Sequence, residues 1–127
     1  MKRYNPLEPP DPEEWTSMNE MGRIRLVEEY HRRARIRLPN AAAHALFHAA
    51  VENQIALGDE TPVKRTVERL MSEGLDRHDA IHAVGSALAG HIYDLLRQGD
   101  AAPRADPNPP YYAALDKLTA EEWRRSR

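Results

Sequence analysis

The chain has 127 residues, which suits one domain, and its 18 Lys and Arg against 20 Asp and Glu give a net charge of −2. A nearly neutral chain is not built to neutralise phosphates, so nucleic acid is not an expected partner. The absence of cysteine excludes disulfides, thiolate catalysis and cysteine-ligated zinc. Because the N-terminus leads into no apolar stretch and no run approaches the ~20 apolar residues of a membrane span, we expect a cytoplasmic protein without membrane contact.

The first third of the chain predicts a proline-rich, extended arm followed by two helices. Asp11 caps a short helix that begins at Pro12, because a proline is tolerated in the first turn. Ser17 and Glu20 have the spacing of a capping box for a longer helix over about 18–35. The apolar residues of this second helix recur at helical spacing and should face the core: Met21, Ile24, Val27, Tyr30 and Ala34.

Three further helices follow, each with a cap before it and a glycine after it. They run over about 41–57, from Thr61-Pro62 to Gly74, and over about 77–98. The caps are Asn40, Thr61 and Asp76, and the terminating glycines are Gly58, Gly74 and Gly99. The helix after Pro62 should bury Val63, Val67, Leu70 and Met71.

The end of the chain predicts a linker over 100–110 and two short helices, one over 111–118 and one capped by Thr119. Since short loops make neighbouring helices antiparallel, we expect an all-α fold: a compact bundle of four main helices with an extended N-terminal arm and short C-terminal helices. Residues 1–99 would form the helical domain with its arm, and residues 100–127 a linker and a C-terminal arm packed on that domain. Aromatic anchors would hold the arms against the bundle or against a second copy in a homodimer: Trp15, Tyr111, Tyr112 and Trp123.

Two of the predicted helices each carry a pair of histidines four positions apart. His44 and His48 lie in the 41–57 helix, followed after four more positions by Glu52, and His78 and His82 lie in the 77–98 helix. Residues four apart stack on one helix face, and both faces also carry apolar residues that should face the core. Two such pairs can bring four imidazoles to one point, which suits zinc and also iron, nickel or copper. The sequence therefore predicts a divalent metal site, with zinc as the first expectation.

Glu52 is the acidic residue closest to these histidines in the pattern. It lies eight residues from His44, about 12 Å along the helix axis, which is too far for one ion to hold both. Glu52 would therefore bind a second metal or accept a hydrogen bond from an imidazole, and it is the first candidate for a general base if the protein is an enzyme. Four more polar residues could face the same space: Glu28, His31, Asn53 and Asp79.

A competing interpretation treats the histidines as a buried polar network. Core histidines bonded to a carboxylate or a carbonyl are common, and the protein would then be a non-enzymatic structural or interaction module. His91 points nearly opposite His78 and His82 on the helical wheel, so we expect it outside the cluster. A metalloprotease motif is excluded because Ala45 follows His44 where that motif needs a glutamate. The pattern indicates no substrate.

The segment 39–97 resembles a bacterial family known as domain of unknown function 1841. The resemblance rests on His44-x3-His48-x3-Glu52-x-Gln54, on Asp59-x-x-Pro62 and on His78-x3-His82. It covers roughly half of the chain and leaves both arms outside. It implies a helical fold with the same histidine and glutamate cluster, and it implies no reaction. Relatives often have an acidic residue one turn after the second pair, where this chain has Gly85 and Ser86, so the resemblance provides no fifth ligand there.

Overall fold

The computed structural model describes residues 1, 3–98 and 106–126. These residues form seven α-helices and one short 3-10 helix, and no strand. The elements are α1 (Pro12–Ser17), α2 (Glu20–Arg33), α3 (Ala41–Ala56), η1 (Gly58–Glu60), α4 (Val63–Ser72), α5 (Arg77–Gln98), α6 (Pro109–Lys117) and α7 (Ala120–Arg125). The predicted all-α class is confirmed. None of the helices in the described ranges is long and apolar enough to cross a membrane.

Local capping explains where most helices begin and end. Asp11, Asn40 and Asp76 each accept a hydrogen bond from the backbone N–H three residues later, at 3.0, 3.1 and 2.8 Å. Gly58 and Gly74 follow α3 and α4 with φ of 64° and 110°, a backbone region that favours glycine. These caps and terminators are as the sequence predicted. The predicted cap Thr61 is wrong, because α4 begins at Val63 and its N-cap is Pro62, which has no side chain that accepts a hydrogen bond. Gly99 lies outside the described residues.

Two details of the prediction for α2 and α4 are wrong. The cap of α2 is Asn19, which accepts from the Gly22 N–H at 2.7 Å, because Ser17 still belongs to α1 and bonds to the Glu14 carbonyl. Met21 and Met71 are 65% and 40% exposed, although both belong to the predicted apolar stripes. The buried faces of their helices are displaced from those stripes toward Leu26 and His31 in α2 and toward Thr66 in α4, and each methionine lies outside them.

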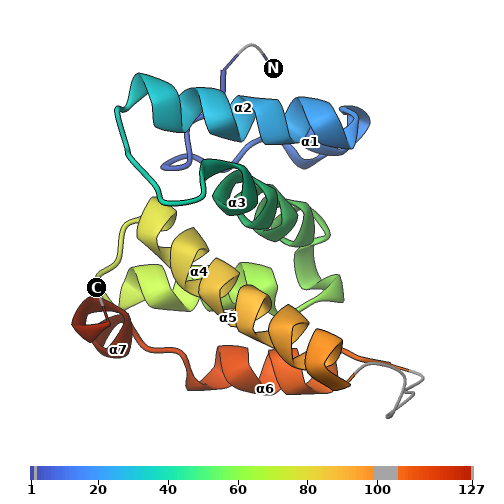
Figure 1. Ribbon diagram of the computed structural model, residues 1–127, viewed down its shortest axis with the longest axis vertical. Helices are drawn as coiled ribbons and strands as arrows, with labels where there is room; N and C mark the ends of the chain where they lie inside the picture. The colour runs from blue at the N-terminus through green and yellow to red at the C-terminus, as the bar shows by residue number, and fades with distance from the viewer. Residues whose placement is uncertain (2, 99–105, 127) are drawn as a thin grey trace.

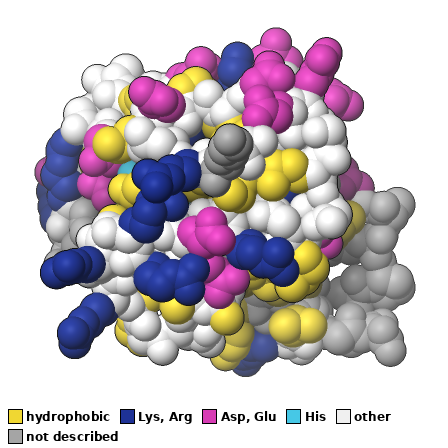
Figure 2. Space-filling view, turned by 90° about the horizontal axis from the view of Figure 1, so that it is seen from above, with side chains coloured by type: hydrophobic (Ala, Val, Ile, Leu, Met, Phe, Trp, Pro, Cys, Tyr) yellow, Lys and Arg dark blue, Asp and Glu magenta, His cyan; other side chains and the backbone are white. Residues whose placement is uncertain are grey.

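The helices pack around α3 and α5, which contact each other in the middle of the molecule (Figure 1). Helices α1 and α2 lie on one side of α3, while α4 and α6 pack on α5. An apolar cluster on the α5 side includes residues of α3 to α7, and a second cluster joins the N-terminal arm to α1, α2 and α3. The face that carries α1 and α2 mixes acidic, basic and apolar side chains, with only a small spot of histidine (Figure 2).

Both arms pack against this framework. The N-terminal arm contains no helix before Pro12, and its Tyr4 is only 1% exposed, packed with Trp15 in the second cluster. In the C-terminal arm, Tyr111 and Leu115 of α6 are buried against α4 and α5. Of the predicted aromatic anchors, Trp15 and Tyr111 are therefore buried in the protein's own core, and Tyr112 and Trp123 pack against it partly buried.

Candidate metal centre

Five histidines from three helices converge at the seam between α2, α3 and α5. They are His31 of α2, His44 and His48 of α3, and His78 and His82 of α5. One nitrogen from each ring can be chosen so that all five atoms lie within 4.8 Å of one another. The structure thus brings together the two pairs that the sequence singled out, and it adds His31 to them. We call these five residues the histidine cluster.

The spacing of the donors is close to that of a single coordination sphere. Two nitrogens on opposite sides of an ion, each bound at about 2.1 Å, lie about 4.2 Å apart. His44 Nε2 and His82 Nε2 are 2.8 Å apart, and His31 Nε2 and His78 Nε2 are 3.2 Å apart. The five nitrogens therefore surround a space of the size that one metal ion occupies.

Hydrogen bonds to residues around the cluster determine which ring nitrogen of His31 and of His48 is available to bind a metal ion. The Nδ1 of His31 donates to the Val27 carbonyl at 2.8 Å, because a carbonyl can only accept, and the lone pair of this neutral ring is therefore on Nε2. The Nε2 of His48 lies 2.8 Å from the Tyr4 hydroxyl, which itself donates to the Glu52 carboxylate. His48 Nε2 must then carry the proton, which leaves the lone pair on Nδ1.

The Nδ1 of His48 is the clearest sign of an incomplete site. The His48 side chain is 2% exposed, and its Nδ1 has no hydrogen-bond partner among the described residues. A buried acceptor without a donor costs about 1–3 kcal/mol. A metal ion among the five rings would provide the missing partner.

Burial lowers the pKa of three imidazoles of the cluster, which favours their neutral form. It lowers the pKa of His31, and it lowers that of His44 to about 4, where the neighbouring His31 contributes further. Burial also holds the pKa of His48 well below its ordinary value, reinforced by the charges of the other four rings. Neutral imidazole is the form that binds metal ions.

Glu52 lies beside the cluster and belongs to a different set of contacts. Its carboxylate is 1% exposed and receives both Nη1 and Nη2 of Arg77, each at 2.8 Å. Arg77 Nη1 also donates to the Pro6 carbonyl at 2.9 Å. Burial and the Glu52 charge raise the pKa of the Tyr4 phenol, so the hydroxyl stays protonated and donates to that carboxylate. The chain Arg77–Glu52–Tyr4–His48 therefore links the buried ion pair to one ring of the cluster.

Among the described residues, the Glu52 carboxylate hydrogen-bonds to Tyr4 and Arg77 and not to an imidazole. We predicted that Glu52 binds a second metal or accepts from an imidazole, and the hydroxyl of Tyr4 lies between the carboxylate and His48. Glu52 is not among the five grouped donors. A single ion in the cluster would be connected to Glu52 only through His48 and the Tyr4 hydroxyl.

Of the four other polar residues named from the sequence, His31 belongs to the set of five donors, and Glu28, Asn53 and Asp79 lie outside it. Asn53 accepts from Trp15 Nε1 and Arg23 Nη1, both at 2.9 Å, and so ties α1 and α2 to α3. Glu28 is exposed, and the backbone N–H of Asp79 is capped by Asp76. His91 stacks on Tyr111 with ring centroids 5.5 Å apart, away from the cluster as expected.

Sequence reasoning missed two residues of the site and undervalued a third. Tyr4 lies in a proline-rich arm that carries no helical pattern, and Arg77 pairs with a carboxylate 25 positions away, so no local signal pointed to either. From the sequence, His31 was only one of four residues that could face the same space, although it follows Val27 by four positions on the buried face of α2. That spacing was the one sequence signal that could have placed His31 in the site.

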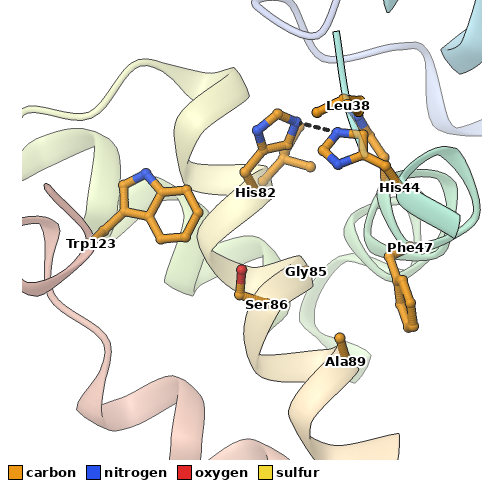
Figure 3. Close-up of a pocket in the computed structure, with 10 residues that line it drawn as sticks. Leu38, His44, Phe47, His82, Gly85, Ser86, Ala89 and Trp123 are labelled. Atoms are coloured by element: carbon orange, nitrogen blue, oxygen red, sulfur yellow. Dashed lines mark hydrogen bonds between the residues drawn. The ribbon is translucent and has the colours of Figure 1, made fainter. Parts of the chain in front are cut away.

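A cavity of about 360 Å³ opens beside the cluster. Its wall includes His44, His48 and His82, and Figure 3 shows Trp123 of α7 on the opposite side from His44. The remaining lining residues are Leu38, Phe47, Ile81, Gly85, Ser86 and Ala89. Three rings of the cluster therefore border a space large enough for a small molecule.

Comparisons with models of known protein families, with curated proteins and with solved structures give no significant match to this chain.

Proposed function

We propose that this protein binds one divalent transition-metal ion through the histidine cluster, with zinc as the first candidate and iron or nickel as alternatives. The observation that carries the proposal is the convergence of five imidazole nitrogens within 4.8 Å. They come from three separate helices, so the tertiary packing of α2, α3 and α5 assembles the site. Imidazole nitrogen suits zinc, iron and nickel alike.

The unpartnered nitrogen of His48 supports a metal over a completed polar network. In a network, each buried ring would give one hydrogen bond and accept another. His44 and His82 are paired in this way, but His48 Nδ1 has no partner among the described residues. An ion satisfies a lone pair at that position, whereas a sixth hydrogen-bonding side chain would be needed to complete a network.

The hydrogen bond between the Tyr4 hydroxyl and the other ring nitrogen of His48, Nε2, also supports a metal site. Histidines that bind metals usually give their second N–H to an oxygen that fixes the ring and its tautomer. Tyr4 does this for His48, and the Val27 carbonyl does it for His31. The buried Arg77–Glu52 pair holds the Tyr4 hydroxyl in place.

The proposal assigns a bound ion and no reaction. Glu52 was the first candidate for a general base, but both its oxygens are engaged by Arg77 and Tyr4. The resemblance to domain of unknown function 1841 stays a prediction and adds no activity.

The test is the metal content of protein purified without an affinity tag. Elemental analysis should give close to one ion per chain, and calorimetry on chelator-treated protein should show one site for zinc. The double variant His44→Gln/His82→Gln should lose this site and still fold, because both side chains are only half-buried. The variant His91→Gln is the matched control, since His91 lies outside the cluster, and it should bind zinc as the unmodified protein does.

Two outcomes would overturn the proposal. One is a protein that binds no zinc, iron or nickel and melts at the same temperature with and without chelator. That result would support a structural module whose histidines form a polar network. The other is a double variant that still binds one ion with unchanged affinity, which would place the site elsewhere in the chain.

A further inference from the structure

The cavity beside the histidine cluster combines a nitrogen-rich wall with an apolar one. His44, His48 and His82 form the first wall, and they are three of the proposed metal ligands. The volume of about 360 Å³ lies near the lower end of ligand pockets, which span about 300–1,000 Å³. The cavity is therefore suited to a molecule with a single ring or a short branched chain.

The rest of the lining favours an apolar body. Phe47, Ile81 and Trp123 contribute to it, together with smaller apolar residues of α5. Figure 3 shows that the lining residues His82, Ser86 and Ala89 follow one another along α5. Burying apolar surface here is favourable by about 25 cal/mol per Å².

The charge of the ion favours an anionic head group. Neutral imidazole ligands leave a divalent ion with its two positive charges, and a bound cation dominates the electrostatics of its surroundings. Among the described residues that line the cavity there is no Asp or Glu. The nearby carboxylate of Glu52 is already paired with Arg77. An anion bound in the cavity would neutralise positive charge of the ion that no lining residue neutralises.

We propose that the cavity binds a small organic monoanion, whose carboxylate lies on the metal ion and whose apolar body lies against Phe47, Ile81 and Trp123. Ser86 lines the same cavity and offers a hydroxyl donor to the second carboxylate oxygen. This inference rests on the proposed function, because the ion provides the charge that selects the anion. It goes further by naming the chemical class of the ligand.

The first experiment uses three probes on the zinc-loaded, full-length chain, measured by calorimetry. Benzoate carries both the head group and the apolar ring, acetate carries the head group alone, and benzyl alcohol carries the ring without a charge. Benzoate should bind about tenfold or more tightly than either of the others, since each lacks one of the two favourable terms. Chelator-treated protein should bind benzoate at least about tenfold more weakly than the loaded protein.

The second experiment fills the cavity. Ala89→Leu adds an apolar side chain to the wall that α5 provides, seven residues from His82, and should weaken benzoate binding about tenfold. Ala113→Leu makes the same chemical change at an exposed position of α6 and should leave benzoate binding unchanged. Both variants should retain one zinc ion, which shows that the cluster itself is intact.

The outcomes separate this inference from the proposed function. A zinc-loaded protein that ignores benzoate overturns the inference and leaves the metal site standing. Equal binding of benzoate with and without zinc, or equal binding of benzyl alcohol, shows an apolar pocket that does not select an anion, and it also overturns the inference. A chain that retains no ion overturns both proposals. The probe series alone decides these points if Ala89→Leu fails to fold.

Discussion

The histidine cluster has a buried side and an open side, which are held in different ways. On the buried side, His31 and His48 are 5% and 2% exposed, and each gives one ring N–H to an oxygen of the protein. On the open side, His44 and His82 are half-buried, share a hydrogen bond of 2.8 Å and border the cavity. One side is fixed by its surroundings, and the other faces a space where an ion and a small molecule can enter.

This difference indicates that the two sides have different roles in the proposed site. Ligand rings whose second nitrogen is held by a hydrogen bond are oriented before the ion arrives, which lowers the cost of binding. The buried side has this support from Tyr4, Glu52 and Arg77. The open side is where exchange of the ion or its additional ligand would occur. Substitutions on the buried side should therefore cost more stability than substitutions on the open side.

The largest expected effect comes from breaking the buried ion pair. Arg77→Met should lower the free energy of unfolding by about 3–5 kcal/mol, because it leaves the Glu52 carboxylate buried without its partner. Lys64→Met is the control, since Lys64 and Glu68 form an exposed pair, and it should cost less than about 1 kcal/mol. Urea unfolding of both variants measures the difference. Similar losses in the two variants would contradict the special role of the buried side.

Metal removal should produce the next largest effect, because it involves both sides of the cluster. Zinc at about 100 times its Kd should stabilise the fold by about 2.7 kcal/mol, and chelation should remove this gain. His44→Gln/His82→Gln should show no change in melting temperature on adding zinc or chelator. Thermal unfolding at fixed protein concentration provides the measurement. A zinc-dependent shift that survives in the double variant would show that the open side does not contribute ligands.

A smaller effect should follow from removing a single hydroxyl on the buried side. Tyr4→Phe leaves the ring of His48 without its hydrogen-bond partner and should weaken zinc binding about 10- to 100-fold. Tyr112→Phe removes a hydroxyl from α6 and should leave zinc affinity unchanged. Competition with a zinc-binding dye reports both affinities. Equal affinity in the two variants would reject the link from Glu52 through Tyr4 to the metal.

A gradual effect should follow from lowering the pH, and it concerns the open side. The pKa of His44 is lowered to about 4, while an unfolded chain titrates near 6.5, so the unfolded state binds more protons between these values. The metal-free protein should therefore lose stability as pH falls from about 6.5 to about 4, and further acid should not increase the contribution of His44. His44→Gln should flatten the profile in this window. An unchanged profile, measured by denaturant unfolding at several pH values, would show that His44 is not desolvated.

The helices and the two histidine pairs were predictable because their signals are local. Caps such as Asn40 and terminators such as Gly58 act on the backbone within a few residues, so the boundaries of α3 followed from the sequence. The spacing of four between His44 and His48 puts both on one helix face whatever the rest of the chain does. The same argument applies to the pair on α5.

By itself, the sequence determined the all-α class, most helix boundaries and the pairing of histidines on single helix faces. These features depend on backbone geometry and on contacts between near neighbours. Only the tertiary structure decided that the two pairs meet, that His31 joins them, and that Tyr4 lies between Glu52 and His48. The reason is physical: these contacts join residues up to 48 positions apart, and such distances are closed by the packing of whole helices and not by any local pattern.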